Sequence, residues 1–390
     1  MIFLLNKVIT IANIVIIGAG TAGMAAARTL QQGLSDQHKV ILIEQHSELY
    51  FQPSLLWLMV GRRKILDITR KTRQMQASSA SVICSEARTV NISKKTVKTT
   101  DDQTFSFDQL ILATGAMATK ANTKELASAG YNLYTVDGAL AINSAIKSFR
   151  GGEIVLVVTS LPHKCPPAVY EAAFLLKEWF SKAGNREDVN ISIHTPEVIP
   201  LQQAGTKVGQ ALSEKLQKQK INLYTEQRFK NVDPVQQIIH FESGEVPYDL
   251  LIYIPRHVAP EVISDSGLAD ETGWISVDPF TLETCYKDIY AIGDVNHILL
   301  PSGLAMPKAG AFAHFQSQVV ADNILKKLEH KPPARFFGGK SACMIETGST
   351  AFALWGNLYK QNPSFIVLPE NRFWLSGKWF VERVWLYEHS

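Results

Sequence analysis

A glycine-rich turn between two apolar segments restricts the fold more than any other feature of this sequence. Residues 13–17 read N-I-V-I-I, a β-branched run typical of a buried parallel strand. The motif G-A-G-T-A-G follows at residues 18–23, and an Ala- and Leu-rich helical segment covers residues 24–32. A second apolar segment, residues 39–43, ends at Glu44. Strand, glycine turn, helix, strand and acidic residue together predict a βαβ unit that binds a dinucleotide.

Each glycine of this motif has a physical role. Gly18 permits the tight turn, Gly20 lets a pyrophosphate approach the backbone, and Gly23 allows close contact between helix and strand. The phosphates then lie at the helix N-terminus, where free N–H groups and the helix dipole favour negative charge. Glu44, 21 residues after Gly23, ends the second strand where ribose hydroxyls would lie. Glycines also occur in ordinary turns, so the prediction of dinucleotide binding rests on the surrounding βαβ unit and not on the glycines alone.

The rest of the chain alternates between predicted strands and helices. Strands are expected at residues 81–84, 96–99, 109–113, 153–159, 190–194, 222–225, 238–241, 250–254 and 289–292. Helices are expected at residues 169–182, 205–219 and 310–328. This alternation predicts an α/β fold with two Rossmann-like dinucleotide-binding domains, followed by an aromatic-rich C-terminal segment.

Composition argues against several other classes of protein. The chain has 39 basic and 36 acidic residues and a net charge of +3, which predicts no nucleic-acid surface. Four cysteines without a C-x-x-C pair predict neither a disulfide framework nor a metal site. No segment reaches the roughly 18 consecutive apolar residues of a membrane-spanning helix. We interpret residues 1–11 as an extension and expect no cleavable signal peptide, because cleavage would fall within the first strand.

Two further segments indicate which dinucleotide is bound. Residues 110–115, L-I-L-A-T-G, are a predicted strand ending in an A-T-G turn, and residues 289–294, I-Y-A-I-G-D, are a strand ending in G-D. With the glycine motif, in this order, they resemble the two-dinucleotide-domain flavoproteins of the pyridine nucleotide–disulfide reductase superfamily. There the A-T-G turn lies near the FAD diphosphate and the aspartate binds the ribityl chain. The resemblance implies that FAD is bound by Gly18, Gly20, Gly23, Glu44, Ala113, Thr114, Gly115, Gly293 and Asp294.

A predicted helix start follows these motifs. Residues 306–310 read M-P-K-A-G, and a proline is well placed in the first turn of a helix. The N-terminus of this helix would face the flavin pyrimidine edge and stabilise the anionic reduced ring. Lys308 is then a further cofactor-binding residue that adds positive charge. An ordinary solvated lysine is the alternative interpretation.

The second domain lacks the glycine motif that a nicotinamide nucleotide needs. Its predicted strand, residues 153–159, is followed by S-L-P-H-K-C-P-P at residues 160–167. Prolines and a cysteine therefore occupy the position where a second pyrophosphate would lie. This pattern disfavours hydride donation by NADH bound in the usual way and indicates another electron donor.

Cys165 is the candidate residue for reaction with such a donor. It precedes two prolines and the amphipathic segment 168–182, which predicts that it is the N-cap or first residue of a helix. The helix dipole, Lys164 and His163 are expected to favour its thiolate. Cys343 lies 178 residues later, where the C-terminal segment would return toward the flavin. Two such thiols can take up a sulfur nucleophile and pass on two electrons. Two ordinary buried thiols are the alternative.

The pattern C-P-P-x-x-Y-E with a late cysteine resembles the sulfide:quinone oxidoreductases and flavocytochrome c sulfide dehydrogenases. The resemblance extends over nearly the whole chain and includes the Y-F-Q-P-S loop at residues 50–54. It implies that Cys165 and Cys343 are the catalytic redox pair and that sulfide and a quinone are the substrates. It makes Glu171, one to two helical turns after Cys165, a catalytic proton acceptor for hydrogen sulfide.

Two departures from the family pattern refine this prediction. Many sulfide:quinone oxidoreductases have a third cysteine before the second domain, but residues 115–151 contain none, which predicts a two-thiol version. Flavocytochrome c enzymes attach FAD covalently through a cysteine in the loop that corresponds to residues 50–61. That loop has no cysteine here, so we expect noncovalent FAD.

The C-terminal segment is rich in aromatic residues. Twelve of the 36 aromatic residues lie in the last 60 positions, including four of the seven Trp, and they are interspersed with Lys378 and Arg383. Such side chains suit a bilayer surface, and a quinone ring needs an apolar aromatic slot. The segment therefore predicts quinone and peripheral membrane contact. Packing on the core or on a second subunit is the alternative.

These observations predict an FAD-dependent sulfide:quinone oxidoreductase. We expect a discontinuous FAD-binding domain over residues 12–120 and 272–330, a second Rossmann-like domain over residues 121–271, and a quinone- and membrane-contact segment over residues 331–390. The protein is expected at the cytoplasmic side of a membrane. A homo-oligomer is one assembly that we consider. The alternatives are a type II NADH:quinone oxidoreductase and an FAD-binding protein without turnover.

Overall fold

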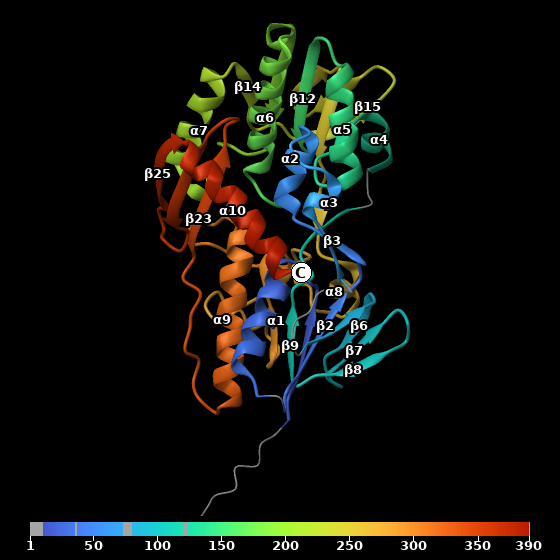
Figure 1. The fold of residues 1–390 in the computed structure, drawn as a ribbon, viewed down its shortest axis with the longest axis vertical. Coiled ribbons are helices and arrows are strands. Elements are labelled where there is room, and N and C mark those ends of the chain that lie inside the picture. The colour runs from blue at the N-terminus through green and yellow to red at the C-terminus, as the bar shows by residue number, and fades with distance from the viewer. Residues whose placement is uncertain (1–10, 36, 73–79, 120–122, 390) are drawn as a thin grey trace, which may run out of the picture.

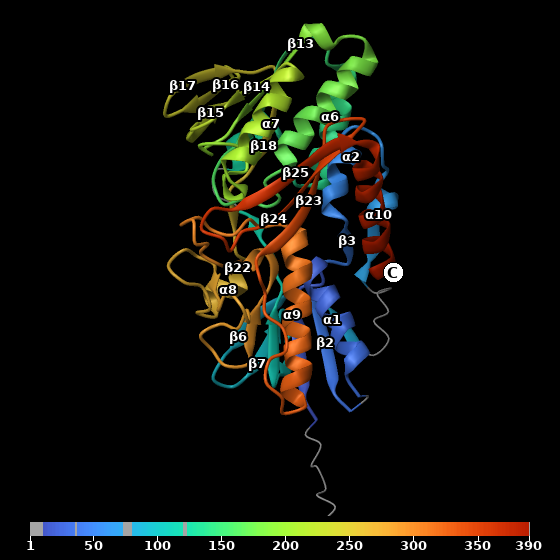
Figure 2. The ribbon, with the colours of Figure 1, turned by 90° about the vertical axis from the view of Figure 1, so that its left-hand side faces the viewer.

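The computed structural model describes residues 11–35, 37–72, 80–119 and 123–389. Residues 1–10 of the predicted extension lie outside the described residues. Two α/β units are stacked along the long axis of the molecule, and the C-terminal segment runs across both of them (Figures 1 and 2). The predicted α/β class with two Rossmann-like units is confirmed.

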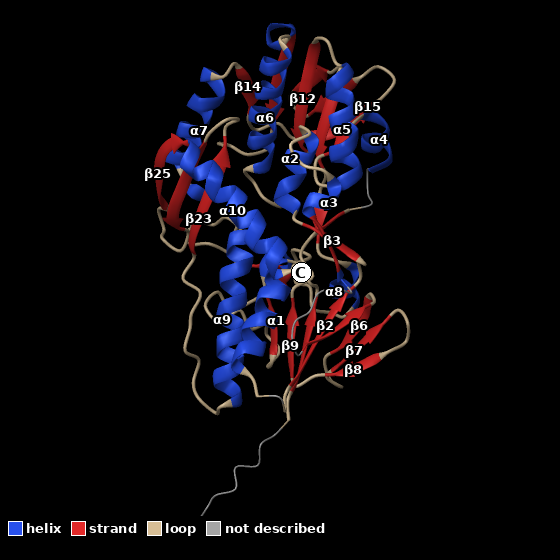
Figure 3. Ribbon diagram, in the orientation of Figure 1, coloured by secondary structure: helices blue, strands red, loops and turns tan. Residues whose placement is uncertain are grey.

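The first unit is built on a five-stranded parallel sheet with the order β21-β9-β1-β2-β5. Its strands are β21 (Ile289–Ala291), β9 (Gln109–Leu112), β1 (Asn13–Ile17), β2 (Lys39–Glu44) and β5 (Ala80–Cys84). The central strand β1 is apolar on both faces because both are covered, and Ile14, Val15 and Ile16 are fully buried. Helices α1 (Thr21–Gly33) and α9 (Gly310–Leu328) pack side by side on one face (Figure 3).

The opposite face of this sheet is covered by smaller elements. They are β6 (Ala87–Asn91), β7 (Thr96–Thr99), β8 (Thr104–Ser106), α8 (Glu261–Asp265), β20 (Ile275–Ser276) and β22 (Asn296–His297). Val15, Val97 and Ile263 share one apolar cluster there. The sheet is therefore buried on both sides and fixes the ends of its strands rigidly.

The second unit contains another five-stranded parallel sheet, with the order β11-β18-β12-β13-β14. Its strands are β11 (Tyr131–Asn132), β18 (Leu250–Ile254), β12 (Gly152–Val158), β13 (Val189–His194) and β14 (Ile221–Tyr224). The accompanying helices are α4 (Thr123–Ala129), α5 (Val136–Ser148), α6 (Ala168–Ala183) and α7 (Thr206–Lys218). One face of this parallel sheet packs against an antiparallel sheet. That sheet consists of β15 (Phe229–Asp233), β16 (Ile238–Phe241) and β17 (Gly244–Pro247).

Several short elements connect the two units. They are β3 (Glu48–Tyr50), α2 (Leu55–Met59), α3 (Ile65–Ile68), β4 (Thr69–Lys71), β10 (Met117–Ala118) and β19 (His257–Val258). Strands β10 and β19 pair antiparallel where the chain passes between the units. Helix α2 follows the first βαβ unit in sequence, yet Leu56 and Trp57 are buried in the core of the second unit.

The aromatic C-terminal segment folds into a sheet and a helix. Strands β23 (Lys340–Glu346), β24 (Ala351–Asn357) and β25 (Ser364–Asn371) form an antiparallel sheet, and helix α10 (Arg372–Glu388) follows. Phe352 belongs to the core of the second unit, whereas Phe337 and Leu358 belong to the core of the first. The segment therefore ties the two units together (Figure 2).

Candidate active site

The three predicted FAD motifs meet at one edge of the first sheet. Strand β1 lies next to β9, and β9 lies next to β21, all parallel and in register. Because the carboxyl ends of parallel strands face the same way, the glycine loop, the turn after Leu112 and the turn after Ile292 are neighbours. This edge is where an α/β sheet binds its ligand.

The glycine loop has the backbone that a dinucleotide requires. Gly18 has φ of +100°, and a Cβ added to it would lie 2.4 Å from the carbonyl oxygen of Ala113. A Cβ on Gly23 would lie 1.8 Å from the carbonyl oxygen of Gly18, so α1 packs directly on the loop. At Gly20 no atom lies within 4 Å of the added Cβ, which leaves room for a phosphate.

Glu44, at the end of β2, is hydrogen-bonded to this loop. Its carboxylate accepts hydrogen bonds from the backbone N–H of Ala19 at 2.7 Å and of His46 at 2.9 Å. Burial acts to raise the pKa of Glu44, but the hydrogen bonds from His46 and Ala19 outweigh it, so the pKa lies below its ordinary value. The carboxylate is therefore ionised at the end of β2, where the ribose hydroxyls of a dinucleotide would lie.

The A-T-G turn supplies a hydroxyl without a partner, and the G-D turn supplies a carboxylate. Thr114 Oγ1 is buried and has no hydrogen-bond partner among the residues that the structure describes. Gly115 has φ of +68° and open space around its Cα, and Gly293 has φ of +75°. Burial raises the pKa of Asp294, and the cations Lys164 and Lys308 oppose that rise. These groups fit the demands of a flavin dinucleotide, whose diphosphate and ribityl hydroxyls would face them.

Lys308 is not a solvated lysine. Only 5% of it is exposed, and its ammonium donates a 2.6 Å hydrogen bond to the carbonyl of Asp294. The same ammonium lies 3.3 Å from the centre of the Trp274 ring. Burial lowers the pKa of Lys308 to about 8, with Asp294 opposing the shift. The side chain thus holds a positive charge two residues before the start of α9.

The predicted helix position of Cys165 is wrong. Helix α6 begins at Ala168, and Pro167 is its N-cap. Cys165 lies earlier, in a left-handed conformation with φ of +44°, and its N–H donates a 2.6 Å hydrogen bond to the carbonyl of Lys308. Cys165 and Pro166 each precede a proline, which disfavours the helical conformation at both residues, so the helix begins only after them. The segment before α9 holds this loop instead.

The predicted thiolate at Cys165 is also wrong. Burial raises the pKa of the Cys165 thiol far above its ordinary value, and the carboxylate of Glu171 adds to the rise. His163 does not supply a positive charge, because burial lowers its pKa to about 4. Burial likewise raises the pKa of Cys343 to about 12, again with a contribution from Glu171. At both sulfurs the surroundings therefore favour the neutral thiol over the thiolate.

The structure does bring Cys165, Cys343 and Glu171 together. Cys343 lies in β23, and both thiols pack against the apolar core of the second unit. Cys343 is one of the groups that raise the pKa of Cys165, and Glu171 raises that of both thiols. Glu171 lies in the first turn of α6, and 4% of it is exposed. The C-terminal segment thus covers the loop after β12.

Sequence reasoning missed the buried ion pairs around Glu171. Lys378 of α10 forms an ion pair with Glu171 and a second, at 3.4 Å, with Glu346 of β23. The backbone N–H of Glu346 donates a 2.7 Å hydrogen bond to Glu171, and Trp57 Nε1 donates one of 2.7 Å to the Glu346 carboxylate. Arg62 pairs with the other carboxylate oxygen of Glu346. The continuous apolar run A-C-M-I in β23 gave no signal for this network.

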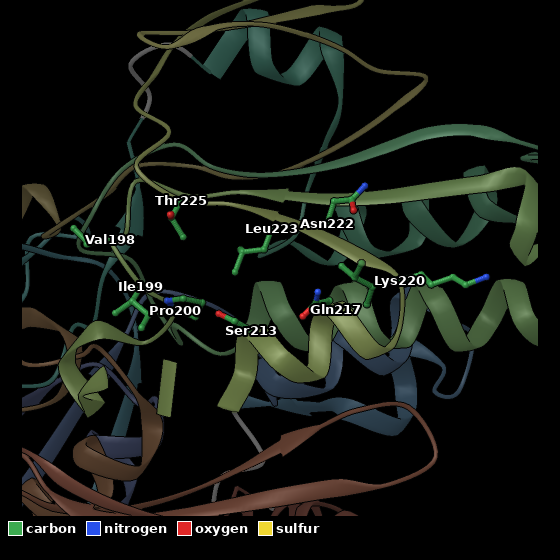
Figure 4. Close-up of a pocket in the computed structure, with 10 residues that line it drawn as sticks. Val198, Ile199, Pro200, Ser213, Gln217, Lys220, Asn222, Leu223 and Thr225 are labelled. Carbon is green, nitrogen blue, oxygen red and sulfur yellow. The ribbon is translucent and has the colours of Figure 1, made fainter. Parts of the chain in front are cut away.

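A hollow of about 450 Å³ lies elsewhere, on the second unit beside α7 and β14 (Figure 4). Ser213 and Gln217 line one side of it, and Leu223 and Thr225 the other. None of the predicted site residues lines this hollow. The predicted site residues lie instead at the glycine loop and at the two thiols, so we take the region between them as the candidate active site.

The fold and this site define a two-unit flavoprotein. Residues 12–317 match the family model described as pyridine nucleotide-disulphide oxidoreductase, and the chain belongs to this family. It is an FAD-binding oxidoreductase. Within the described residues, no helix has the length and apolar character needed to cross a membrane.

Comparison with individual proteins shows which kind of flavoprotein this chain is similar to. The chain is 24% identical over 359 residues to the mitochondrial sulfide:quinone oxidoreductase of Mus musculus, covering 86% of this chain and 76% of that protein. It is 23% identical to the mitochondrial sulfide:quinone oxidoreductase of Schizosaccharomyces pombe, covering 90% and 82%. The crystal structure of the sulfide:quinone oxidoreductase from Aquifex aeolicus superposes with a TM-score of 0.86 at 21% identity, covering 97% of this chain and 91% of that one.

Proposed function

We propose that this flavoprotein is a sulfide:quinone oxidoreductase that oxidises sulfide through Cys165 and Cys343 and passes two electrons to a membrane quinone. The observation that carries the proposal is the meeting of two partly buried thiols and one buried carboxylate, Glu171, beside the segment before α9. The similarity to named sulfide:quinone oxidoreductases supports the same assignment.

The residues divide the chemistry between them. In the oxidised pair, Cys165 and Cys343 share a sulfur–sulfur bond, and hydrosulfide cleaves it to give a persulfide on one cysteine and a thiolate on the other. Joining of the persulfide and thiolate as a trisulfide then releases two electrons and one proton. FAD, when bound, accepts two electrons and passes them on. The glycine loop and Asp294 would hold it there, and Lys308 would add positive charge near the reduced ring.

Glu171 is the proposed proton acceptor for hydrogen sulfide. Burial raises its pKa, whereas Lys378 opposes the rise and holds the side chain in place. A carboxylate with a raised pKa is a stronger base near neutral pH than an exposed one. Glu171 therefore combines a fixed position with a useful basicity next to both thiols.

Anaerobic reduction of the flavin tests the proposed donor. Purified protein is mixed with sulfide or with NADH under argon, and the visible flavin band is followed. We expect sulfide to bleach the band within seconds and NADH to bleach it at least about tenfold more slowly. Faster bleaching by NADH favours the type II NADH:quinone oxidoreductase. A band that neither donor bleaches favours an FAD-binding protein without turnover.

The outer face of α10 supports peripheral membrane contact. Phe373, Phe380 and Tyr387 lie on one stripe of the helix and are 70%, 69% and 74% exposed. Arg372 and Arg383 are exposed beside them. An apolar stripe flanked by arginines is the pattern of a helix that lies in a membrane interface. We infer that this face rests on the bilayer that contains the quinone.

Vesicle flotation measures this contact. Replacing Phe373 and Phe380 by Asp is expected to move most of the protein from vesicles containing anionic lipid to the unbound fraction. Val235→Asp is the matched control, because Val235 is 90% exposed on the β15–β16 turn of the second unit. Equal flotation of the double variant and the wild type would show that this face of α10 is not the membrane contact.

A further inference from the structure

The backbone at Cys165 has a conformation that its place in the sequence opposes. Its φ of +44° lies in the left-handed region, which residues other than glycine rarely adopt. Pro166 follows it, and a residue before proline prefers an extended backbone with φ near about −120°. A conformation of this kind persists only where surrounding groups hold it, and such conformations cluster at functional sites. The groups that hold Cys165 are therefore of functional interest.

Two backbone hydrogen bonds form one part of that hold. The Cys165 N–H donates a 2.6 Å hydrogen bond to the carbonyl of Lys308. The Cys165 carbonyl accepts one of 2.9 Å from the N–H of Ala168, where α6 begins. Almost any residue supplies these backbone groups, so the two bonds do not explain how this sequence specifies the conformation.

The side chain of Tyr134 forms another part. Tyr134 lies between β11 and α5, and its hydroxyl donates hydrogen bonds to the carbonyl of Lys164 and, at 3.2 Å, to the carbonyl of Cys165. In an extended backbone, successive carbonyls point in opposite directions, so one hydroxyl would not reach both. In a left-handed residue the two carbonyls lie on the same side. The Tyr134 hydroxyl therefore fits the observed conformation of Cys165 and not the extended one.

The Tyr134 ring is itself held in place. It lies edge-on to the His257 ring of β19, with centroids 5.2 Å apart and planes at 89°. The Lys164 ammonium lies 5.8 Å from the centre of the same ring. The Tyr134 N–H donates a 2.9 Å hydrogen bond to Asn132 Oδ1. Because packing fixes the ring, its hydroxyl can fix the peptide groups that it contacts.

The direction of the Cys165 side chain depends on this hold. Its Cα–Cβ bond turns with φ, so relaxation to an extended backbone would turn the sulfur away from its present direction. The loop of Cys165 leads into the first turn of α6, and that turn is joined to β23, which carries Cys343. The joint is the 2.7 Å hydrogen bond from the Glu346 N–H to Glu171. Both thiols pack against the same apolar core.

We propose that Tyr134 is a positioning residue for the thiol pair: its hydroxyl holds Cys165 in the left-handed conformation that directs the sulfur toward Cys343. Tyr134 belongs to none of the motifs on which the family resemblance rests. The inference rests on the proposed function, because it takes the two thiols to interconvert with a disulfide. It concerns how readily that disulfide forms, and an equilibrium with glutathione measures this without sulfide or quinone.

The equilibrium between dithiol and disulfide tests this role. Holoprotein is equilibrated under argon with mixtures of glutathione and glutathione disulfide, and peptide mass spectrometry after alkylation gives the oxidised fraction of Cys165 and Cys343. One glutathione disulfide oxidises the pair and leaves as two glutathione molecules. Tyr134→Phe keeps the ring and removes the hydroxyl. It is expected to lower the equilibrium constant for the disulfide about 3- to 10-fold, the factor for one hydrogen bond between neutral groups.

Tyr359→Phe is the matched control. The Tyr359 hydroxyl also donates to a backbone carbonyl, that of Pro279 at 2.6 Å, but Tyr359 packs against the core of the first unit. This variant is expected to keep the wild-type equilibrium constant. An equal fall in Tyr359→Phe and Tyr134→Phe would overturn the proposal, because it would assign the effect to general loosening of the fold.

Tyr134→Phe is expected to fold normally. The Lys164 carbonyl still accepts a 2.9 Å hydrogen bond from His163 Nδ1, and the Cys165 carbonyl still accepts the one from Ala168, so neither is left without a donor. Thermal unfolding of Tyr134→Phe is therefore expected within about 3 °C of Tyr359→Phe.

The remaining outcomes separate the hydroxyl, the ring and the thiol pair. An equilibrium constant in Tyr134→Phe equal to that of the wild type would overturn the proposal. Tyr134→Leu lacks both ring and hydroxyl and is expected to fall at least as far as Tyr134→Phe; a fall in the Leu variant alone would assign the effect to ring packing and overturn the role of the hydroxyl. A wild-type pair that forms no disulfide at any glutathione ratio would contradict the proposed redox pair itself, and the positioning role would fall with it.

Discussion

Burial decides the chemical state of the two candidate redox thiols. A cysteine beside a lysine and a histidine is expected to ionise, but desolvation disfavours the charged form more strongly than those neighbours favour it. In the reduced pair, the neutral thiol is consequently favoured at Cys165 and at Cys343, with Glu171 adding to the effect. Ionisation of either sulfur has to accompany the reaction and does not precede it.

The pH dependence of alkylation follows from this state. A thiol is protonated below its pKa, so its thiolate fraction rises tenfold per pH unit until that pKa is reached. Cys343, with a pKa of about 12, is expected to show iodoacetamide labelling that still rises tenfold per unit between pH 8 and 10. Free cysteine, which titrates at about 8.5, is the reference and levels off earlier. Labelling is measured by peptide mass spectrometry.

Two exposed cysteines check reagent access in the same sample. Cys84 and Cys285 are exposed, so both are expected to be labelled before Cys343 at pH 8. Labelling of Cys343 that levels off at or below pH 9 would contradict the proposed neutral thiol.

At the scale of elements, the ends of parallel strands create the cofactor edge. The glycines of the loop after β1 act differently: Gly23 is needed for packing and Gly20 for ligand approach. This difference predicts opposite behaviour of two similar substitutions.

Gly23→Ala and Gly20→Ala separate folding from binding. The added methyl at position 23 would meet the Gly18 carbonyl, which is expected to destabilise the FAD-free protein by about 1–3 kcal/mol. The methyl at position 20 meets nothing, so unfolding of the FAD-free protein is expected to stay unchanged while FAD binding weakens at least about tenfold. Urea unfolding and flavin titration measure the two effects. Equal stability losses would contradict the assignment.

Sequence patterns predicted these elements better than their contacts. Periodicity placed β1, β9 and β21, and the parallel-strand rule brought their motifs to one edge. The prediction of a thiolate at Cys165 failed because the ionisation of a thiol depends on its burial. That burial comes from β23, which lies far away in the sequence. Lys378 was noticed as a tail charge, yet its pairing with Glu171 joins residues 207 positions apart, which local patterns do not encode.

At the scale of the whole molecule, the C-terminal segment completes the site. Strand β23 supplies Cys343, and α10 supplies Lys378 to the carboxylates of Glu171 and Glu346. The same helix presents its apolar stripe outward and reaches the glycine loop at its end. Folding of this segment is therefore coupled to formation of the thiol site.

Removal of the Lys378 charge tests that coupling. Lys378→Met leaves Glu171 buried without its cation and leaves Glu346 with Arg62 alone, and we expect the free energy of unfolding to fall by about 3–5 kcal/mol. Lys182→Met is the matched control, because Lys182 is 70% exposed in its pair with Glu178 and such pairs contribute about 0–1 kcal/mol. Urea unfolding of both variants gives the comparison. Equal, small losses would show that the Lys378 pairs contribute little.

The most direct test of the proposed mechanism is single-turnover reduction of the flavin by sulfide in Cys165→Ser. The variant is mixed anaerobically with sulfide in a stopped-flow instrument, with Cys285→Ser as the matched control. We expect the flavin band to persist in Cys165→Ser, with a rate at least about 1,000-fold lower, while the bound FAD spectrum and the control rate stay unchanged. Bleaching of Cys165→Ser at the wild-type rate would contradict sulfur transfer through this thiol.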